Sequence, residues 1–149
     1  MNYLNQSESA QRRHERDRQL TELYCEVFDN LKAKRVKNLR QVALSIALET
    51  GTPRYHVGFD RAYAIVPKLL SGKQAINFKS NVNREMWLDL AEKVKCLMTE
   101  GKMSAAQAIT IVLEQCRASR FYLTPTHAWF IIKRQLSMMN CRRPYGRAA

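Results

Sequence analysis

The sequence predicts an all-α protein made of two tandem tri-helical, helix-turn-helix-like units packed as a small six-helix bundle. Five Gly and four Pro in 149 residues are few, and long stretches carry apolar residues at helical spacing. The second observation is an internal repeat: RYHVGFDRAYAIVPKLL, which starts at Arg54, returns as RFYLTPTHAWFIIKRQL, which starts at Arg120. A constant offset without a gap indicates that one supersecondary unit occurs twice.

Each copy of the repeat is expected to have the order helix, helix, turn, short extended link and helix. The identical pairs between the copies are Arg54/Arg120, Ala62/Ala128, Ile65/Ile131 and Leu70/Leu136. Polar and basic stretches mark the borders of the copies. The expected parts of the chain are an N-terminal unit with a polar extension over 1–72, a basic linker over 73–83, a second unit over 84–140 and a basic tail over 141–149.

In the first copy, apolar residues at helical spacing predict a first helix over 8–34. Asn38 can cap a second helix over 39–49 by accepting a backbone hydrogen bond, and Gly51 ends that helix. The residues expected to be buried in the second helix are Val42, Leu44, Ile46, Ala47 and Leu48.

The third helix of the first copy is expected to begin at about Phe59, after a short extended link. Pro67 lies inside its pattern, and proline removes a helical hydrogen bond. The helix should therefore end or kink near Val66.

In the second copy, Gly101 should end the first helix and Ser104 should cap the next. Thr124 is the expected cap of the last helix, with Pro125 at its first position, and the helix should reach about Met139. The residues expected to line the first helix are Trp87, Leu88, Leu90, Ala91, Val94, Leu97 and Met98. Those expected to face the core from the last helix are Ala128, Ile131, Ile132, Leu136 and Met139.

The charge balance points to a polyanionic partner. Lys and Arg number 25 against 13 Asp and Glu, a formal net charge of +12. Such an excess favours nucleic acid, a ribosome or an anionic membrane surface. The alternative is a basic protein with no such partner.

Cysteine spacing and hydropathy favour the cytoplasm. The four cysteines show no CxxC spacing, so reduced thiols are expected. The polar N-terminal sequence is unlike a signal peptide, and no run approaches 18 apolar residues. A membrane partner is not expected, whereas a homodimer or another protein partner stays open.

Catalysis is not expected, because no set of titratable residues converges in sequence. His14, His56 and His127 lie far apart, and no HExxH, Walker or GxGxxG motif occurs. We expect no catalytic residue, no metal ligand and no cofactor.

Nucleic-acid binding has more support, because two helices joined by a turn can present the second helix to a DNA groove. Basic residues concentrate on the third helix of each copy, in the linker and in the tail. The predicted contact residues are Arg35, Lys37, Arg61, Lys68, Thr126, His127, Lys133, Arg134, Arg142 and Arg143. An ordinary solvated helix face is the alternative for each of them.

The repeated arginines and aromatic residues are interpreted as structural. Arg54 and Arg120 each precede an aromatic pair, of which the first member should be buried and the second partly exposed. A phosphate contact is the alternative for these arginines. Tyr63 and Trp129 are expected in the core rather than as platforms for stacked bases.

The segments TPRYHVGFDRAYAIV and ASRFYLTPTHAWFII resemble the pattern Pro-Ala-Pro-Arg-aromatic-aromatic-Val-Ser followed by a helix. It occurs in small uncharacterised proteins of phages and mobile elements of Bacteroidetes-type bacteria. Here Gly58 stands where Ser is usual and Ser119 where Pro is usual. The resemblance implies a mobile-element context and brings no activity with it.

The sequence therefore predicts a DNA-binding regulatory or accessory protein of a phage or mobile element that contacts mainly phosphates. One alternative is a protein–protein adaptor or structural phage component. The other is an RNA-binding accessory subunit of a polymerase or reverse transcriptase.

Overall fold

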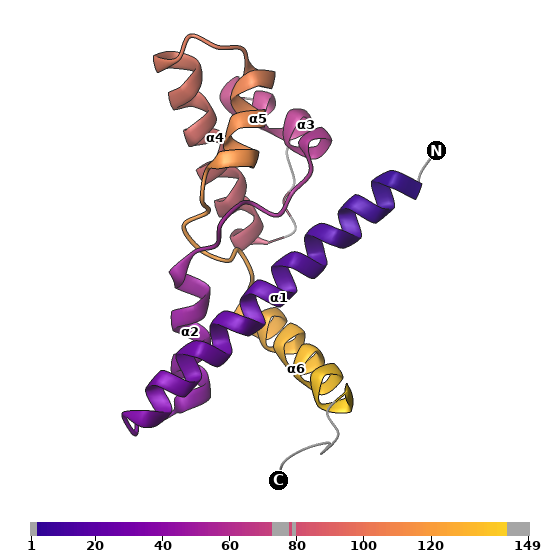
Figure 1. The fold of residues 1–149 in the computed structure, drawn as a ribbon. Coiled ribbons are helices and arrows are strands. Elements are labelled where there is room, and N and C mark those ends of the chain that lie inside the picture. Colours follow the sequence, from indigo (N-terminus) through magenta and orange to yellow (C-terminus); the bar gives the residue numbers. More distant parts are fainter. Residues whose placement is uncertain (1–2, 73–77, 79, 143–149) are drawn as a thin grey trace. The chain divides into compact units, whose positions relative to one another are not determined.

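A computed structural model describes the backbone of residues 3–72, 78 and 80–142, and the side chains of this part from Glu8 to Met139. The described chain is all-α and contains no strand, as the sequence predicts. Six helices follow one another (Figure 1): α1 Tyr3–Ala33, α2 Leu39–Thr50, α3 Phe59–Leu70, α4 Asn81–Glu100, α5 Ala105–Gln115 and α6 Pro125–Arg142.

The helices form two compact units that do not follow chain order. Unit 1 contains α1, α2 and α6, and unit 2 contains α3, α4 and α5. The expected units, 1–72 and 84–140, would each have kept three consecutive helices. Instead, each unit combines the first two helices of one copy of the repeat with the third helix of the other copy. The chain thus exchanges its third helices between its two halves.

The exchange begins at Thr52 and Ala118, which occupy equivalent positions in the two copies. The N–H of Thr52 donates to the carbonyl of Ala118, and the N–H of Ala118 donates to the carbonyl of Thr52, both at 3.0 Å. Both residues are buried. Pro53 disfavours a helical conformation at Thr52. The link that follows α2 is therefore extended and does not turn back onto α2.

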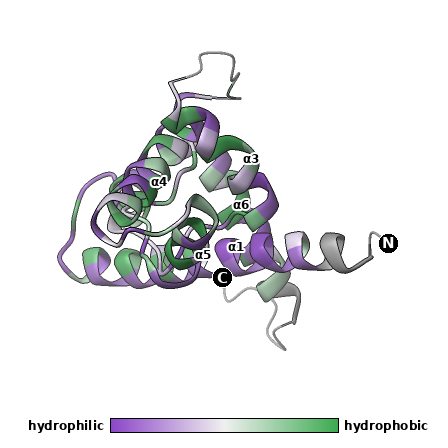
Figure 2. Cartoon of the chain, turned by 90° about the horizontal axis from the view of Figure 1, so that it is seen from above, coloured by the Kyte–Doolittle hydropathy of each residue, from purple (hydrophilic) through white to green (hydrophobic). Residues whose placement is uncertain are grey.

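The core of unit 1 needs α6 as much as α1 and α2. Its buried residues are Leu20 and Tyr24 of α1, Ala43, Ala47 and Leu48 of α2, Phe121 and Leu123 of the link, and Ala128, Ile131 and Ile132 of α6. The backbone N–H of Phe121 donates to the carbonyl of Leu48 at 2.9 Å, which fixes the link against the end of α2. The described start of α1 is hydrophilic (Figure 2), in agreement with the expected polar extension.

Unit 2 repeats this packing with the equivalent residues of α3. The buried triplet Ala62, Ile65 and Val66 of α3 matches Ala128, Ile131 and Ile132 of α6, at the same offset as the sequence repeat. The buried residues of its other helices include Trp87, Leu90 and Val94 of α4 and Ile109 and Val112 of α5. Two helices with the same buried pattern therefore fill equivalent places in different units.

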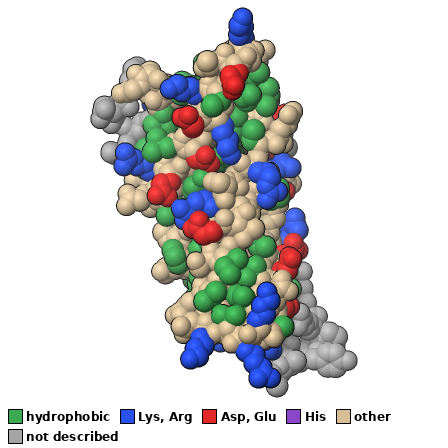
Figure 3. All heavy atoms as spheres, turned by 90° about the vertical axis from the view of Figure 1, so that its left-hand side faces the viewer, with side chains coloured by type: hydrophobic (Ala, Val, Ile, Leu, Met, Phe, Trp, Pro, Cys, Tyr) green, Lys and Arg blue, Asp and Glu red, His purple; other side chains and the backbone are tan. Residues whose placement is uncertain are grey.

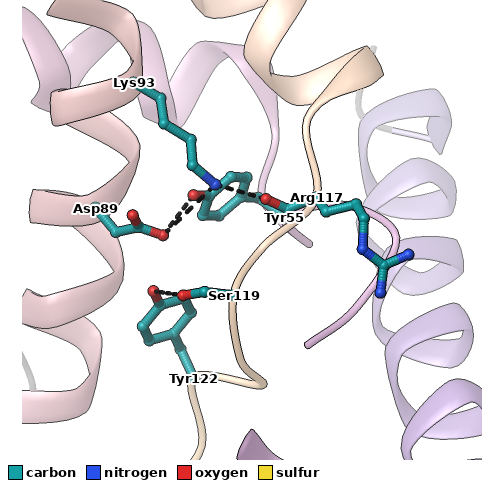
Figure 4. A network of polar contacts seen from close by, with 6 residues as sticks. All are labelled: Tyr55, Asp89, Lys93, Arg117, Ser119 and Tyr122. Carbon is teal, nitrogen blue, oxygen red and sulfur yellow. Dashed lines mark hydrogen bonds and ion pairs between the residues drawn. The ribbon is translucent and has the colours of Figure 1, made fainter. Parts of the chain in front are cut away.

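Polar contacts in unit 2 hold the first link against α4 (Figure 4). The hydroxyl of Tyr55 donates to the carboxylate of Asp89. The ammonium group of Lys93 lies 4.9 Å from the centre of the Tyr55 ring and donates to the carbonyl of Arg117 at 2.6 Å. In unit 1, the hydroxyl groups of Ser119 and Tyr122 share a hydrogen bond of 3.1 Å.

The repeated arginine of unit 1 contacts the end of α2 and an aromatic ring of its own link. The guanidinium of Arg120 pairs with Glu49 at 3.2 Å and lies 5.7 Å from the centre of the Tyr122 ring. Tyr55 and Phe121 are buried, whereas His56 and Tyr122 are partly exposed, so the expected burial of the aromatic pairs is confirmed.

Most helix ends agree with the sequence. Gly51 ends α2 with a φ of 96°, and Ser104 caps α5 in a capping box with Gln107. The hydroxyl of Thr124 accepts from the N–H of His127 at 3.2 Å, as expected for the cap of α6. Three ends differ, and each has a local cause.

Pro67 does not end α3, which continues to Leu70. The hydrogen bond lost at Pro67 concerns the carbonyl of Tyr63, a residue on the exposed face where water can replace the missing donor. The helix α4 begins at Asn81, inside the expected linker, because the Ser80 hydroxyl accepts from the N–H of Asn83. The last helix runs beyond Met139 to Arg142.

Some apolar side chains expected in the core are exposed instead. They are Ile46, Tyr63, Leu88 and Met139, with exposed fractions of 40%, 49%, 45% and 43%. Helical spacing alone assigned them to a wide apolar stripe. Each core is formed by only three helices, so only the centre of each apolar stripe is covered.

The exchange predicts that the two halves of the chain depend on each other. Fragments 1–72 and 80–149, expressed together, should form a one-to-one complex with the helix content of the intact chain, because each fragment supplies the helix that completes the other unit. Circular dichroism and analytical ultracentrifugation would measure this. Stable, fully helical monomers of the separate fragments would contradict the exchange.

Candidate functional site

A surface groove of about 670 Å³ lies in unit 1, where the first turns of α2 and α6 meet the last third of α1. Ligand sites commonly measure about 300 to 1,000 Å³. The residues that line it are Phe28, Asn38, Leu39, Arg40, Gln41, Leu44, Pro125, Thr126 and Trp129. None of them is acidic. This feature is called the α2/α6 groove below.

Aromatic rings form one wall of the groove. The ring of Trp129 meets that of Tyr24 edge to face, with centroids 5.8 Å apart, and Tyr24 lies 5.8 Å from Phe28. Trp129 is packed against the core but remains partly exposed, so its expected burial is only partial. The guanidinium of Arg40 lies 5.8 Å from the centre of the Trp129 ring. A cation and a large aromatic surface therefore face the same space.

The start of α2 leaves backbone donors beside this wall. Asn38 adopts a left-handed conformation with a φ of 54°, and its side chain makes no capping hydrogen bond, contrary to the sequence prediction. The first helical hydrogen bond runs from the N–H of Val42 to the carbonyl of Asn38. The preceding N–H groups of the first turn have no partner within the helix. Neither α2 nor α6 has an acidic residue in its first turn, so their positive ends are not neutralised.

A basic segment leads into the groove from the end of α1. Its exposed cations are Lys32, Lys34, Arg35, Lys37 and Arg40. Within the described part of the chain, no carboxylate pairs with any of them. In Figure 3, Lys and Arg side chains gather at the lower end of the face around an apolar patch, without red side chains between them. The five cations are called the basic segment below.

The predicted contact residues fall in different places. Arg35 and Lys37 belong to the basic segment, and Thr126 lines the groove. His127 and Lys133 are exposed on α6. The structure thus brings Thr126 close to residues that lie far away in the sequence.

Arg134 is exposed but already engaged within unit 1. Its guanidinium lies 3.5 Å from the carboxylate of Asp17 and 5.8 Å from the centre of the Phe130 ring. Asp17 is buried and also pairs with Arg16 at 2.9 Å. Removal of Arg134 would leave this buried carboxylate with one cation fewer, so its first role is structural.

The remaining predicted residues are not part of this site. Arg61 and Lys68 are exposed on α3, which belongs to unit 2. The side chain of Arg142 and the whole of Arg143 lie outside the described residues.

The expected helix-turn-helix pairs are also divided. The helix after each link, α3 or α6, belongs to a different unit from the helix before it. The extended links are the reason, since a helix-turn-helix needs a tight turn between its two helices. A helix-turn-helix made of the second and third helices of one copy therefore does not lie within a single unit.

Sequence reasoning missed the two residues that give the groove its character, Arg40 and Trp129. A signal for Arg40 existed, because it is the last cation of KAKRVKNLR. No sequence signal placed Trp129 beside it, since the two residues meet only when α6 packs on α2.

A second groove of about 620 Å³ lies between α1 and α6 on another side of unit 1. It includes His14 and His127, with Arg13, Asp17 and Arg134 nearby. No group of three or more His, Cys, Asp or Glu in the described chain is arranged to hold a metal ion. Among the described helices, none is long and apolar enough to cross a membrane.

The chain matches no known protein family, no curated protein and no solved structure. Its function is therefore argued from the site itself.

The electrostatics of the groove can be tested at Tyr24. Burial raises the pKa of its phenol above the ordinary value of 10.0, and the charge of Arg40 opposes this effect. A raised pKa in the folded state means that stability is constant below pH 10 and falls as the pH rises through the folded pKa.

Urea denaturation at pH 9 and pH 11 should show this loss of stability in the wild type and a smaller loss in Tyr24→Phe. In Arg40→Ala, the phenol should ionise at still higher pH, which an ultraviolet titration would detect. Tyr63→Phe, which removes an exposed hydroxyl, is the control. An identical alkaline loss in the wild type and Tyr24→Phe would contradict the assignment.

Proposed function

We propose that the protein binds nucleic acid, DNA in particular, through phosphate contacts made by unit 1. The observation that carries the proposal is the basic segment: five exposed cations without a carboxylate partner in the described chain, next to a groove without acids. Cations paired on the protein have to be released before they can bind a phosphate. These cations are free to replace the counterions of DNA, which is the main source of affinity for a polyanion.

The charge distribution supports unit 1 as the binding unit. Residues 119–149, which contribute α6, contain no Asp or Glu. In unit 2, Lys93 is engaged with Asp89 and the carbonyl of Arg117. A regulatory or accessory role in a phage or mobile element agrees with the sequence resemblance.

An adaptor role is the second candidate, and one feature of unit 2 favours it. Phe59 and Tyr63 are both exposed on α3 and stack with centroids 5.6 Å apart. Exposed aromatic side chains are common in protein interfaces. An adaptor would bind through α3 and show no affinity for DNA even at low salt.

Charge reversal in the basic segment should weaken DNA binding in proportion to the phosphate contacts removed. For Lys34→Glu, Arg35→Glu and Lys37→Glu together, fluorescence anisotropy with a labelled 20-base-pair duplex should show a large loss of affinity at low salt. The slope of log K against log salt should fall by about 0.9 per lost contact.

The matched control is the triple variant Arg84→Glu, Lys95→Glu and Lys102→Glu, which makes the same change in net charge at exposed positions of unit 2. Equal losses in both triple variants would show a nonspecific effect of net charge. Lys133→Glu with Arg134→Glu should also weaken binding, and circular dichroism is needed there because Arg134 pairs with buried Asp17.

A further inference from the structure

We propose that the α2/α6 groove holds one unpaired nucleotide of a DNA single strand. The base would lie against the aromatic wall at Trp129, and its phosphate would lie at Arg40 and the first turn of α2. The inference rests on the proposed function, since it assumes that unit 1 binds nucleic acid. It adds which form of DNA is preferred and which residues decide the preference.

The groove combines the two features that single-stranded nucleic acid requires. Partly exposed Trp129 offers a flat ring for stacking, and every base can stack because each has an aromatic face. Arg40 supplies a cation that, among the described residues, pairs with no carboxylate. An arginine guanidinium can stack on a ring and bind phosphate oxygens.

The direction of approach also fits a strand with its backbone outside the groove. The basic segment continues from Arg40 to Lys37 and Arg35 along the connection between α1 and α2. Phosphates on either side of the inserted nucleotide would meet these cations. A base in a duplex is stacked and paired, so it would have to leave the helix before it could enter the groove.

The equivalent place in unit 2 provides an internal comparison, because the repeat gives it the same fold with other side chains. Ala106 replaces Arg40, Asp60 replaces Thr126 and Tyr63 replaces Trp129. Unit 2 therefore lacks the cation that a phosphate requires. In addition, the carboxylate of Asp60 would repel a phosphate at this place.

Two backbone N–H groups at the start of α5 are also occupied. The Ser104 side chain accepts from the N–H of Gln107, and the Gln107 side chain accepts from the N–H of Ser104. The ring of Phe59 stacks on that of Tyr63 with an interplanar angle of 15°, in the place where a base would stack. The two copies have thus diverged at the same position, and only unit 1 keeps the composition of a nucleotide site.

The test converts the groove of unit 1 into the composition of unit 2. Binding of a labelled twelve-residue oligo(dT) and of a twelve-base-pair hairpin would be measured for the wild type and for Arg40→Ala with Thr126→Asp. The wild type should bind the single strand more tightly. The double variant should lose affinity for the single strand by roughly 10- to 150-fold, the range for a lost hydrogen bond to a charged group, and much less for the hairpin.

A matched control makes the same change in net charge away from the groove. Lys102→Ala with Thr99→Asp alters exposed positions at the end of α4 and beyond. It should change the affinity for both DNA forms by the same small factor. Circular dichroism would confirm that both variants keep the fold.

Tryptophan fluorescence gives a second readout, because it reports stacking of a base on Trp129 and does not depend on the net charge of the protein. The chain has two tryptophans, of which Trp87 is buried in unit 2 and Trp129 lies in the groove. Saturation with oligo(dT) should quench the emission of the wild type, and Trp129→Phe should remove this change while the oligonucleotide still binds.

The outcomes separate the two proposals. No binding of either DNA form at low salt would overturn both. Equal affinity for the two forms, unchanged tryptophan emission, or equal losses in the groove variant and its control would overturn the nucleotide site and leave phosphate binding by the basic segment intact.

Discussion

The paired hydrogen bonds between Thr52 and Ala118 determine how this chain is organised. They bind the two extended links to each other at equivalent positions of the repeat. Each link is extended where it follows the second helix of its copy, and the third helix packs in the other unit. The cores are completed instead by exchange, with α6 in unit 1 and α3 in unit 2. Every buried cluster in the described chain then includes residues from both halves of the sequence.

The exchange also decides the chemistry of the α2/α6 groove. If three consecutive helices had packed together, α3 would occupy the place of α6 beside Arg40. Asp60 and Tyr63 would then stand where Thr126 and Trp129 do. A carboxylate near Arg40 would compensate its charge. The basic character of the groove thus depends on which third helix reaches it.

The two units show how a duplicated fold can keep its packing while its surfaces diverge. The buried triplets of α3 and α6 correspond residue by residue, because a core tolerates few changes of volume. The exposed residues at the starts of equivalent helices in the two copies differ in charge and in capping. The Ser104 side chain accepts from the N–H of Gln107 in α5, whereas the Asn38 side chain caps no N–H of α2. This difference costs little in the packing of either core.

The sequence by itself determined the helices, the repeat and most of the caps, because these depend on neighbours within a few residues. It also predicted the burial of Tyr55 and Phe121 and the exposure of Thr126, His127 and Lys133. The sequence could not assign α3 and α6 to a unit, since their buried triplets are nearly interchangeable. Periodicity shows that a helix has an apolar face but does not show which helices pack against that face. For the same reason the sequence overestimated the width of the buried apolar stripes, to which it assigned Ile46, Leu88 and Met139. Only the tertiary structure placed Trp129 beside Arg40, because that contact joins residues far apart in the chain through the geometry of two extended links.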